Sequence, residues 1–114
     1  MRKFGGPTKN SPGVHMQVTT TRTGDEAVVI IAGDVDSETS PQLEAELTAV
    51  LRTGARSMIV DVEAVSFLGS TGLSVLIGAH RAADRFELRR GNRIVDRLIE
   101  LTGLGRLYGD AEPV

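Results

Sequence analysis

Two apolar runs, each followed by a stretch with helical character, constrain the fold of this chain more than any other feature. Residues 27–32 (AVVIIA) and 57–62 (SMIVDV) are rich in the β-branched side chains that favour strands. The first run is apolar throughout, so it indicates a strand buried on both faces, with Gly33 ending it. Because strands that alternate with helices form parallel sheets, the pattern predicts an α/β fold.

The helix between these two strands has clear start and end signals. Ser40 is a good N-cap residue, Pro41 suits the first helical position, and Gly54 is typical of the position just past a helix. The apolar side chains between these ends follow i, i+4, i+7 and i+8 spacing: Leu43, Leu47, Val50 and Leu51. They form one stripe, as expected of a helix packed on a sheet.

Two further segments complete the first part of the fold. Residues 16–22 alternate weakly and predict an edge strand, which a turn at residues 23–26 joins to the first apolar run. Residues 72–83 predict a second helix that is apolar on nearly every side, as in a helix that is deeply buried or partly covered by a partner. One face of this helix carries Ser74, Gly78 and Arg81.

The C-terminal part of the chain predicts short elements. Residues 86–89 suit a short strand, and Asn92 is placed to cap a third helix that stops at Gly103. Residues 104–108 predict a last short strand. The whole order predicts a mainly parallel central sheet with an antiparallel hairpin at its N-terminal edge and helices packed against it.

We expect one domain over residues 16–108, because 114 residues are too few for two. Residues 1–15 are rich in Gly, Pro and polar side chains, and we interpret them as a disordered tail or an expression remnant. Residues 109–114 are expected to form a flexible C-terminal tail.

Composition excludes several kinds of chemistry. The chain has no cysteine, so disulfides and thiolate sites are excluded, and its few aromatic residues leave an aliphatic core. A formal charge of −2 gives no general attraction to nucleic acid or to an anionic membrane. No apolar run approaches the length of a membrane span and no secretory signal is visible, so a cytoplasmic location is the expectation.

The charges are unevenly distributed along the chain. Residues 23–50 contain seven acids and no base, whereas residues 81–97 contain six arginines and three acids. Ordinary solvated faces explain most of these charges. An acidic pole and a basic pole would suit the docking of a charged partner.

No arrangement typical of an enzyme stands out. His80 is on the second helix, where a single histidine is most often a packing or surface residue, and no metal-ligand cluster or nucleotide motif is visible. Residues 69–72 (GSTG) resemble a nucleophile elbow, but the spacing differs and His80 is out of reach along the same helix. We therefore predict no catalysis, cofactor or metal, and a small hydrolase that uses Ser70 is the catalytic alternative.

Two adjacent hydroxyl residues, Ser70 and Thr71, stand where the second helix begins. A helix N-terminus exposes unpaired N–H groups and favours negative charge. A hydroxyl there can cap the helix, or it can accept a phosphate that the helix end stabilises. For an arbitrary Ser-Thr pair, the cap is the expected role.

Three motifs around this pair have a specific order and spacing. They are residues 32–36 (AGDVD), 59–73 (IVDVEAVSFLGSTGL) and 98–104 (LIELTGL). Together the chain resembles the STAS family over about residues 17–108, in particular the bacterial anti-sigma factor antagonists. The resemblance implies a module that binds an anti-sigma factor with a GHKL-type kinase domain and frees a sigma factor. It also implies that the kinase phosphorylates a serine to end the binding, and that a phosphatase restores it.

The resemblance also implies the site residues. By motif match the phosphorylated residue is Ser70, with Thr71 as the lesser candidate, and Asp36 matches a loop acid beside it. The implied partner-binding residues are Asp34, Asp36, Gly69, Ser70, Thr71, Gly72, Ser74 and Gly78. The alternative is a STAS scaffold or sensor subunit that binds proteins or a nucleotide without being phosphorylated.

The chain departs from the family pattern at two places. Gly69 stands where family members commonly have aspartate, so we expect altered recognition by a kinase. The chain also ends soon after Tyr108, without the usual final amphipathic helix. Apolar surface exposed in this way could be covered by a homodimer, or it could lower the stability of the fold.

Overall fold

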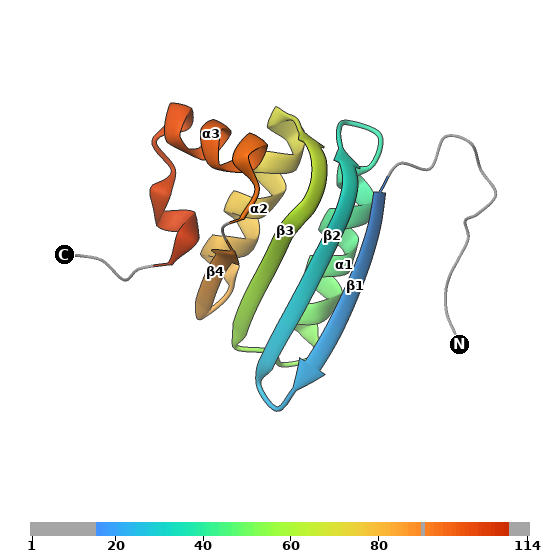
Figure 1. Ribbon diagram of the computed structural model, residues 1–114. Coiled ribbons are helices and arrows are strands. Elements are labelled where there is room, and N and C mark those ends of the chain that lie inside the picture. Colours follow the sequence, from blue (N-terminus) through green and yellow to red (C-terminus); the bar gives the residue numbers. More distant parts are fainter. Residues whose placement is uncertain (1–15, 90, 110–114) are drawn as a thin grey trace.

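Four strands form one mixed sheet in the order β1-β2-β3-β4 (Figure 1). The computed structural model describes residues 16–89 and 91–109, so the predictions for residues 1–15 and 110–114 lie outside the described residues. The strands are β1 (Met16–Thr23), β2 (Glu26–Val35), β3 (Ser57–Leu68) and β4 (Arg85–Arg89). The pair β1–β2 is antiparallel and the other two pairs are parallel, which confirms the predicted sheet.

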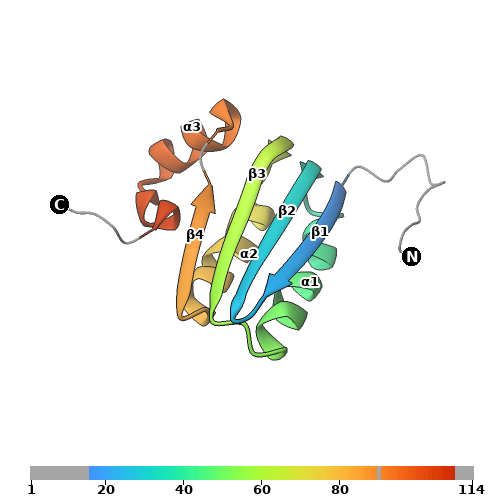
Figure 2. The ribbon, with the colours of Figure 1, turned by 60° about the horizontal axis from the view of Figure 1, so that its bottom comes forward.

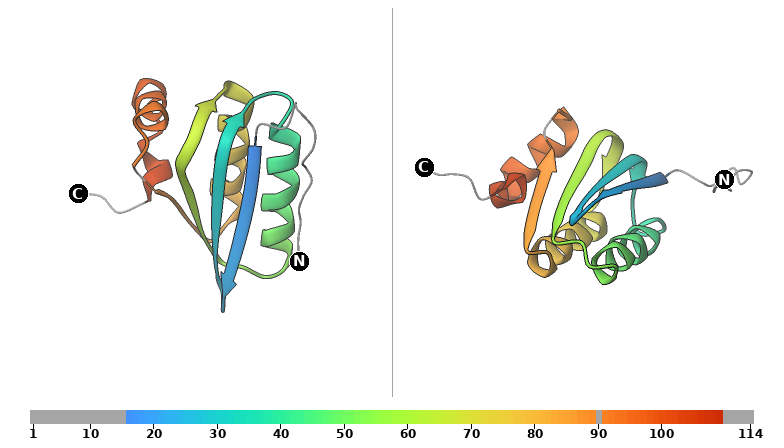
Figure 3. Two further views of the ribbon diagram at one scale, coloured as in Figure 1. Left: turned by 45° about the vertical axis from the view of Figure 1, so that its right-hand side comes forward. Right: turned by 90° about the horizontal axis from the view of Figure 1, so that it is seen from below.

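The helices occupy two places around this sheet. Helices α1 (Ser40–Arg52) and α2 (Ser70–Ala82) lie side by side on one face (Figure 3). Helix α3 (Arg93–Thr102) and the short 3-10 helix η2 (Gly105–Tyr108) lie at the β4 side of the sheet, far from β1 (Figure 2). No helix formed by the described residues is long and apolar enough to cross a membrane.

Most of the core lies between the sheet and the pair α1–α2, and the core is almost wholly aliphatic, as composition predicts. Its largest fully buried side chains include those of Ile31, Leu43, Leu47, Met58, Leu76 and Leu88. The predicted stripe of α1 faces this core, with Leu43, Leu47 and Val50 buried and Leu51 partly buried.

The prediction that the first apolar run is buried on both faces is wrong. In β2 the side chains alternate: Ala27, Val29 and Ile31 are buried, whereas Ile30 is 42% exposed. The reason is that α1 and α2 cover one face only, and no helix of the described chain covers the other face above β1 and β2 (Figure 3). An apolar run therefore accompanies a strand that has only one fully buried face.

Both central strands run further than predicted. Strand β2 passes through Gly33 and ends at Val35, and β3 continues through the expected loop to Leu68. Gly33 has φ of 96°, and the β2–β3 register shifts on both sides of it. An irregular pairing with a glycine in the left-handed region allows a strand to bend and continue, so Gly33 does not end β2.

The helix signals are confirmed at most ends. Gly54 and Gly103 follow α1 and α3 with positive φ, and Asn92 caps α3 by accepting from the Val95 backbone N–H. The predicted start of α1 is wrong by one residue, because Thr39 precedes the helix and Ser40 is inside it.

Two other boundaries also differ from the predictions. Helix α2 begins at Ser70, two residues before its predicted start. The last predicted strand is wrong as well, because Gly105–Tyr108 forms the 3-10 helix η2. There Leu107 is buried, and its N–H donates to the Leu104 carbonyl. The local turn satisfies this backbone without the pairing that a strand needs.

Candidate functional site

The N-termini of α1 and α2 meet at the carboxyl ends of β2 and β3 (Figure 1). Strands β2 and β3 are parallel here, with Asp34 opposite Phe67 and Val35 opposite Leu68. The Gly69 N–H donates to the Val35 carbonyl over 2.9 Å, so the chain enters α2 directly beside the end of β2. Sequence segments that are more than thirty residues apart thus form one end of the molecule.

Ser70 and Thr71 occupy the first two positions of α2, and neither caps it. Gly69 is the residue before the helix, with extended backbone, and no side chain of the described residues caps the helix there. The capping interpretation of the two hydroxyls is therefore wrong. Ser70 is exposed, and its hydroxyl has no hydrogen-bond partner within residues 16–89 and 91–109.

Thr71 differs from Ser70 because its hydroxyl is already engaged. Its Oγ1 lies 3.1 Å from the Ser40 Oγ, a hydrogen bond that links the starts of α1 and α2. The Ser40 hydroxyl in turn donates to the Asp36 carbonyl over 2.6 Å. Reasoning from the sequence missed this role of Ser40, because a serine before Pro41 looks like a cap.

Asp36 organises the loop that leads into α1. Its Oδ1 accepts from the backbone N–H groups of Glu38 (2.9 Å) and Thr39 (3.0 Å), as a capping side chain does. The Thr39 hydroxyl lies 3.2 Å from the same oxygen and donates to the Asp34 carbonyl over 2.8 Å. Asp36, the loop acid of the predicted site, therefore stabilises the loop before α1.

The family model described as "Mlab, STAS domain" matches residues 18–109 of this chain. The chain belongs to the STAS family. The anti-sigma-B factor antagonist of Staphylococcus aureus (strain NCTC 8325 / PS 47) is 33% identical over 96 residues, covering 80% of this chain and 88% of that relative.

Other relatives of this STAS domain carry similar names. The anti-sigma-F factor antagonist RsfB of Mycobacterium tuberculosis (strain CDC 1551 / Oshkosh) is 29% identical over 85 residues, which cover 72% of this chain and 70% of RsfB. An anti-sigma factor antagonist from Mycobacterium paratuberculosis has a crystal structure that matches with a TM-score of 0.77 and 28% identity over 86% of each chain. The predicted family and fold are confirmed, and these relatives are anti-sigma factor antagonists.

Gly72 is the one predicted partner-binding residue of the STAS domain that lies buried. A Cβ at this position would stand 2.4 Å from Val35 Cγ1 and 2.8 Å from Leu68 Cδ1. The first turn of α2 therefore approaches the ends of β2 and β3 too closely for any side chain there. Gly72 supports the site from within, and it is not a surface that a partner can contact.

Gly69, in contrast, is not required by the backbone. Its φ is −90°, which any residue adopts, and a Cβ would stand 3.2 Å from the Phe67 ring. That ring is 50% exposed and can move aside. The fold would therefore accept the aspartate that the family resemblance implies at this place. With glycine there instead, the chain lacks that negative charge beside Ser70.

The remaining predicted site residues continue along one exposed side of α2. Ser74 and Gly78 are both exposed, about 6 and 12 Å from Ser70 along the helix axis. Asp34 and Asp36 are partly buried at the strand ends. No group of three acidic or histidine side chains in the described ranges could hold a metal ion.

Proposed function

We propose that this STAS domain is an anti-sigma factor antagonist that is switched off by phosphorylation of Ser70. Unphosphorylated, it binds an anti-sigma factor that has a GHKL-type kinase domain, and this binding frees the sigma factor. The kinase then transfers phosphate from ATP to Ser70, the complex dissociates, and a phosphatase restores the binding form. The relatives named as anti-sigma factor antagonists support the general role.

The exposed Ser70 hydroxyl at the uncapped start of α2 is the observation on which the switch depends. A kinase needs a hydroxyl that is accessible and not already bound, and Ser70 meets both conditions within the described chain. Thr71 is also exposed, but its hydroxyl is hydrogen-bonded to Ser40. This difference supports Ser70 over Thr71 as the acceptor.

The helix end explains how the fold would tolerate the phosphate. Within residues 16–89 and 91–109, no side chain caps the N–H groups at the start of α2. A phosphate on Ser70 would add a charge of about −1.5 to −2 next to these donors, which favour an anion. The phosphorylated domain is therefore expected to keep its fold.

A partner seated on this surface would not tolerate the same change. The proposed contact surface consists of Ser70, Thr71, Ser74 and Gly78, bordered by Asp34 and Asp36. A phosphate there adds bulk, a cost of desolvation and repulsion from acidic groups of the partner. A loss of about 3 kcal/mol would weaken binding by roughly a hundredfold.

The direct test measures affinity for candidate anti-sigma factors by calorimetry, with mass spectrometry of the Ser70 peptide after incubation with ATP. Ser70→Ala is expected to bind as wild type does but to take up no phosphate. Ser70→Glu is expected to bind at least about tenfold more weakly. Thr19→Glu is a matched control, because Thr19 is an exposed hydroxyl on the sheet face away from α2.

The outcomes separate the proposal from its alternatives. Equal affinities for wild type, Ser70→Ala and Ser70→Glu would contradict a switch at Ser70. Stable binding of all forms with no phosphate transfer would point to a constitutive scaffold. Labelling of Ser70 by a serine-directed covalent probe would instead support the hydrolase alternative.

A further inference from the structure

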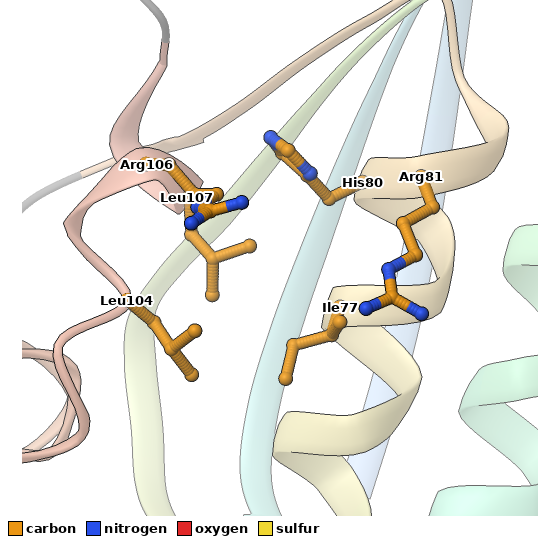
Figure 4. A pocket seen from close by; sticks show the side chains of 6 residues that line it. All are labelled: Ile77, His80, Arg81, Leu104, Arg106 and Leu107. Carbon is orange, nitrogen blue, oxygen red and sulfur yellow. The ribbon is translucent and has the colours of Figure 1, made fainter.

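A cavity lies beside α2, away from Ser70. A cavity of ≈ 450 Å³ opens between the C-terminal half of α2 and the segment that follows α3 (Figure 4). It is lined by Ile77, His80, Arg81, Leu104, Arg106 and Leu107. His80 follows Ser70 by ten residues, so the cavity is about 15 Å further along the helix.

The polar side chains of this cavity are all bases. Arg106 on η2 and His80 on α2 point toward each other across it, and Arg81 runs beside Ile77 (Figure 4). No acid is among the lining residues. Neither Arg81 nor Arg106 forms an ion pair within the described residues, so both guanidinium groups are available to an anion.

The rest of the cavity wall is aliphatic and well held. Leu107 is 1% exposed, and Ile77 and Leu104 pack partly buried against the core. The His80 ring meets the Phe86 ring edge-on with centroids 5.5 Å apart, which holds it at the edge of the cavity. An aliphatic floor with bases around it is suited to a ligand that is apolar at one end and anionic at the other.

We propose that this cavity binds an anionic amphiphile, a carboxylate or a phosphate joined to a short aliphatic chain. Guanidinium groups bind both anions through paired, charge-assisted hydrogen bonds. The volume lies within the range of small-molecule sites, about 300–1,000 Å³. Net negative charge on the whole chain does not oppose this, because the acids are not among the lining residues.

The test is an NMR titration of the full chain with octanoate, octyl phosphate and, as the neutral counterpart, octanol. Saturable shifts of the amide signals at residues 77–81 and 104–107 are expected with one or both anions. The two anions separate the carboxylate from the phosphate form of the ligand. The proposal would be overturned if neither anion bound saturably, or if octanol bound as tightly as the anions.

Variants tie the binding to the cavity. Arg106→Gln is expected to weaken binding of the anion by about tenfold or more, because it removes a charge-assisted pairing. Arg93→Gln removes an exposed arginine of α3 that does not line the cavity and is expected to bind as wild type does. Arg81→Gln provides the same test from the α2 side should Arg106→Gln disturb η2. Undiminished binding by both cavity variants would refute the site.

Discussion

Ser70 and Thr71 are neighbours in the chain, but the structure gives their hydroxyl groups different surroundings. The Thr71 hydroxyl bonds Ser40 and thereby joins two helix starts, whereas the Ser70 hydroxyl is free within the described residues. The sequence could place both residues at the start of a helix. The motif match favours Ser70, but the helix-start signal does not tell the two hydroxyl groups apart, because the partner that engages Thr71 comes from a segment thirty-one residues away.

At the same scale, two glycines of α2 are expected to respond in opposite directions to one methyl group. Gly72→Ala would bring Cβ to 2.4 Å from Val35 Cγ1 and should destabilise the domain by about 1–3 kcal/mol. Gly78→Ala meets nothing within 4 Å and should stabilise it by about 0.5–1 kcal/mol, because alanine favours the helix.

Urea denaturation of the two glycine variants measures both effects. If Gly72→Ala is as stable as wild type, the close approach of α2 to β2 is contradicted. The Gly78→Ala variant has a second use, because it is expected to fold and would carry its new methyl group on the proposed contact surface. Weaker binding of an anti-sigma factor by this variant would support that surface.

At the scale of elements, one buried side chain attaches α3 to the sheet. Asn92 is 8% exposed, and its Nδ2 donates to the carbonyls of Val62 (3.1 Å), Glu63 (3.1 Å) and Val65 (2.6 Å). Its Oδ1 accepts from Val95 N–H at the start of α3. Strand β4 pairs with β3 only as far as Asp61, so Asn92 satisfies carbonyls of β3 that lie beyond β4.

The cap of α3 was predictable from the sequence, but the attachment was not, and substitutions at Asn92 separate the two roles. Asn92→Ala loses both the cap of α3 and the hydrogen bonds to β3, and it should lower the free energy of unfolding by about 2–4 kcal/mol. Asn92→Asp keeps a good capping oxygen but sets a carboxylate against three carbonyl oxygens. We expect it to be at least as destabilising as Asn92→Ala in chemical denaturation. Full stability of Asn92→Asp would show that only the cap matters.

At the scale of the whole molecule, the sheet has one covered face and one open face over β1 and β2. Val29 and Ile31 are buried on the covered face and Ile30 lies on the open face, because successive side chains of a strand point to opposite faces. The order of elements was predictable because each has a local signal. The coverage of the faces was not, because it depends on where α3 packs, and α3 lies at the β4 side of the sheet.

Adjacent isoleucines provide a matched test of this layer arrangement. Ile31→Ala should cost about 2–5 kcal/mol, because Ile31 is 1% exposed in the core. Ile30→Ala should cost only about 1 kcal/mol, because Ile30 is 42% exposed and its neighbours on the open face do not enclose it. Thermal or urea unfolding measures the difference, and equal losses at the two positions would contradict an open face.

The sequence by itself determined the α/β order, the aliphatic core, the STAS family and the place of Ser70 at a helix start, because each depends on local spacing or a contiguous motif. Tertiary structure alone decided that Gly72 is buried, that Ser40 engages Thr71 whereas Ser70 has no hydroxyl partner within the described residues, and that α2 and the segment after α3 line a cavity with basic side chains. These features depend on contacts between distant segments, which local periodicity does not encode. Among the described residues, the GSTG segment is thus a helix start without a side-chain cap, at which the Ser70 hydroxyl has no partner.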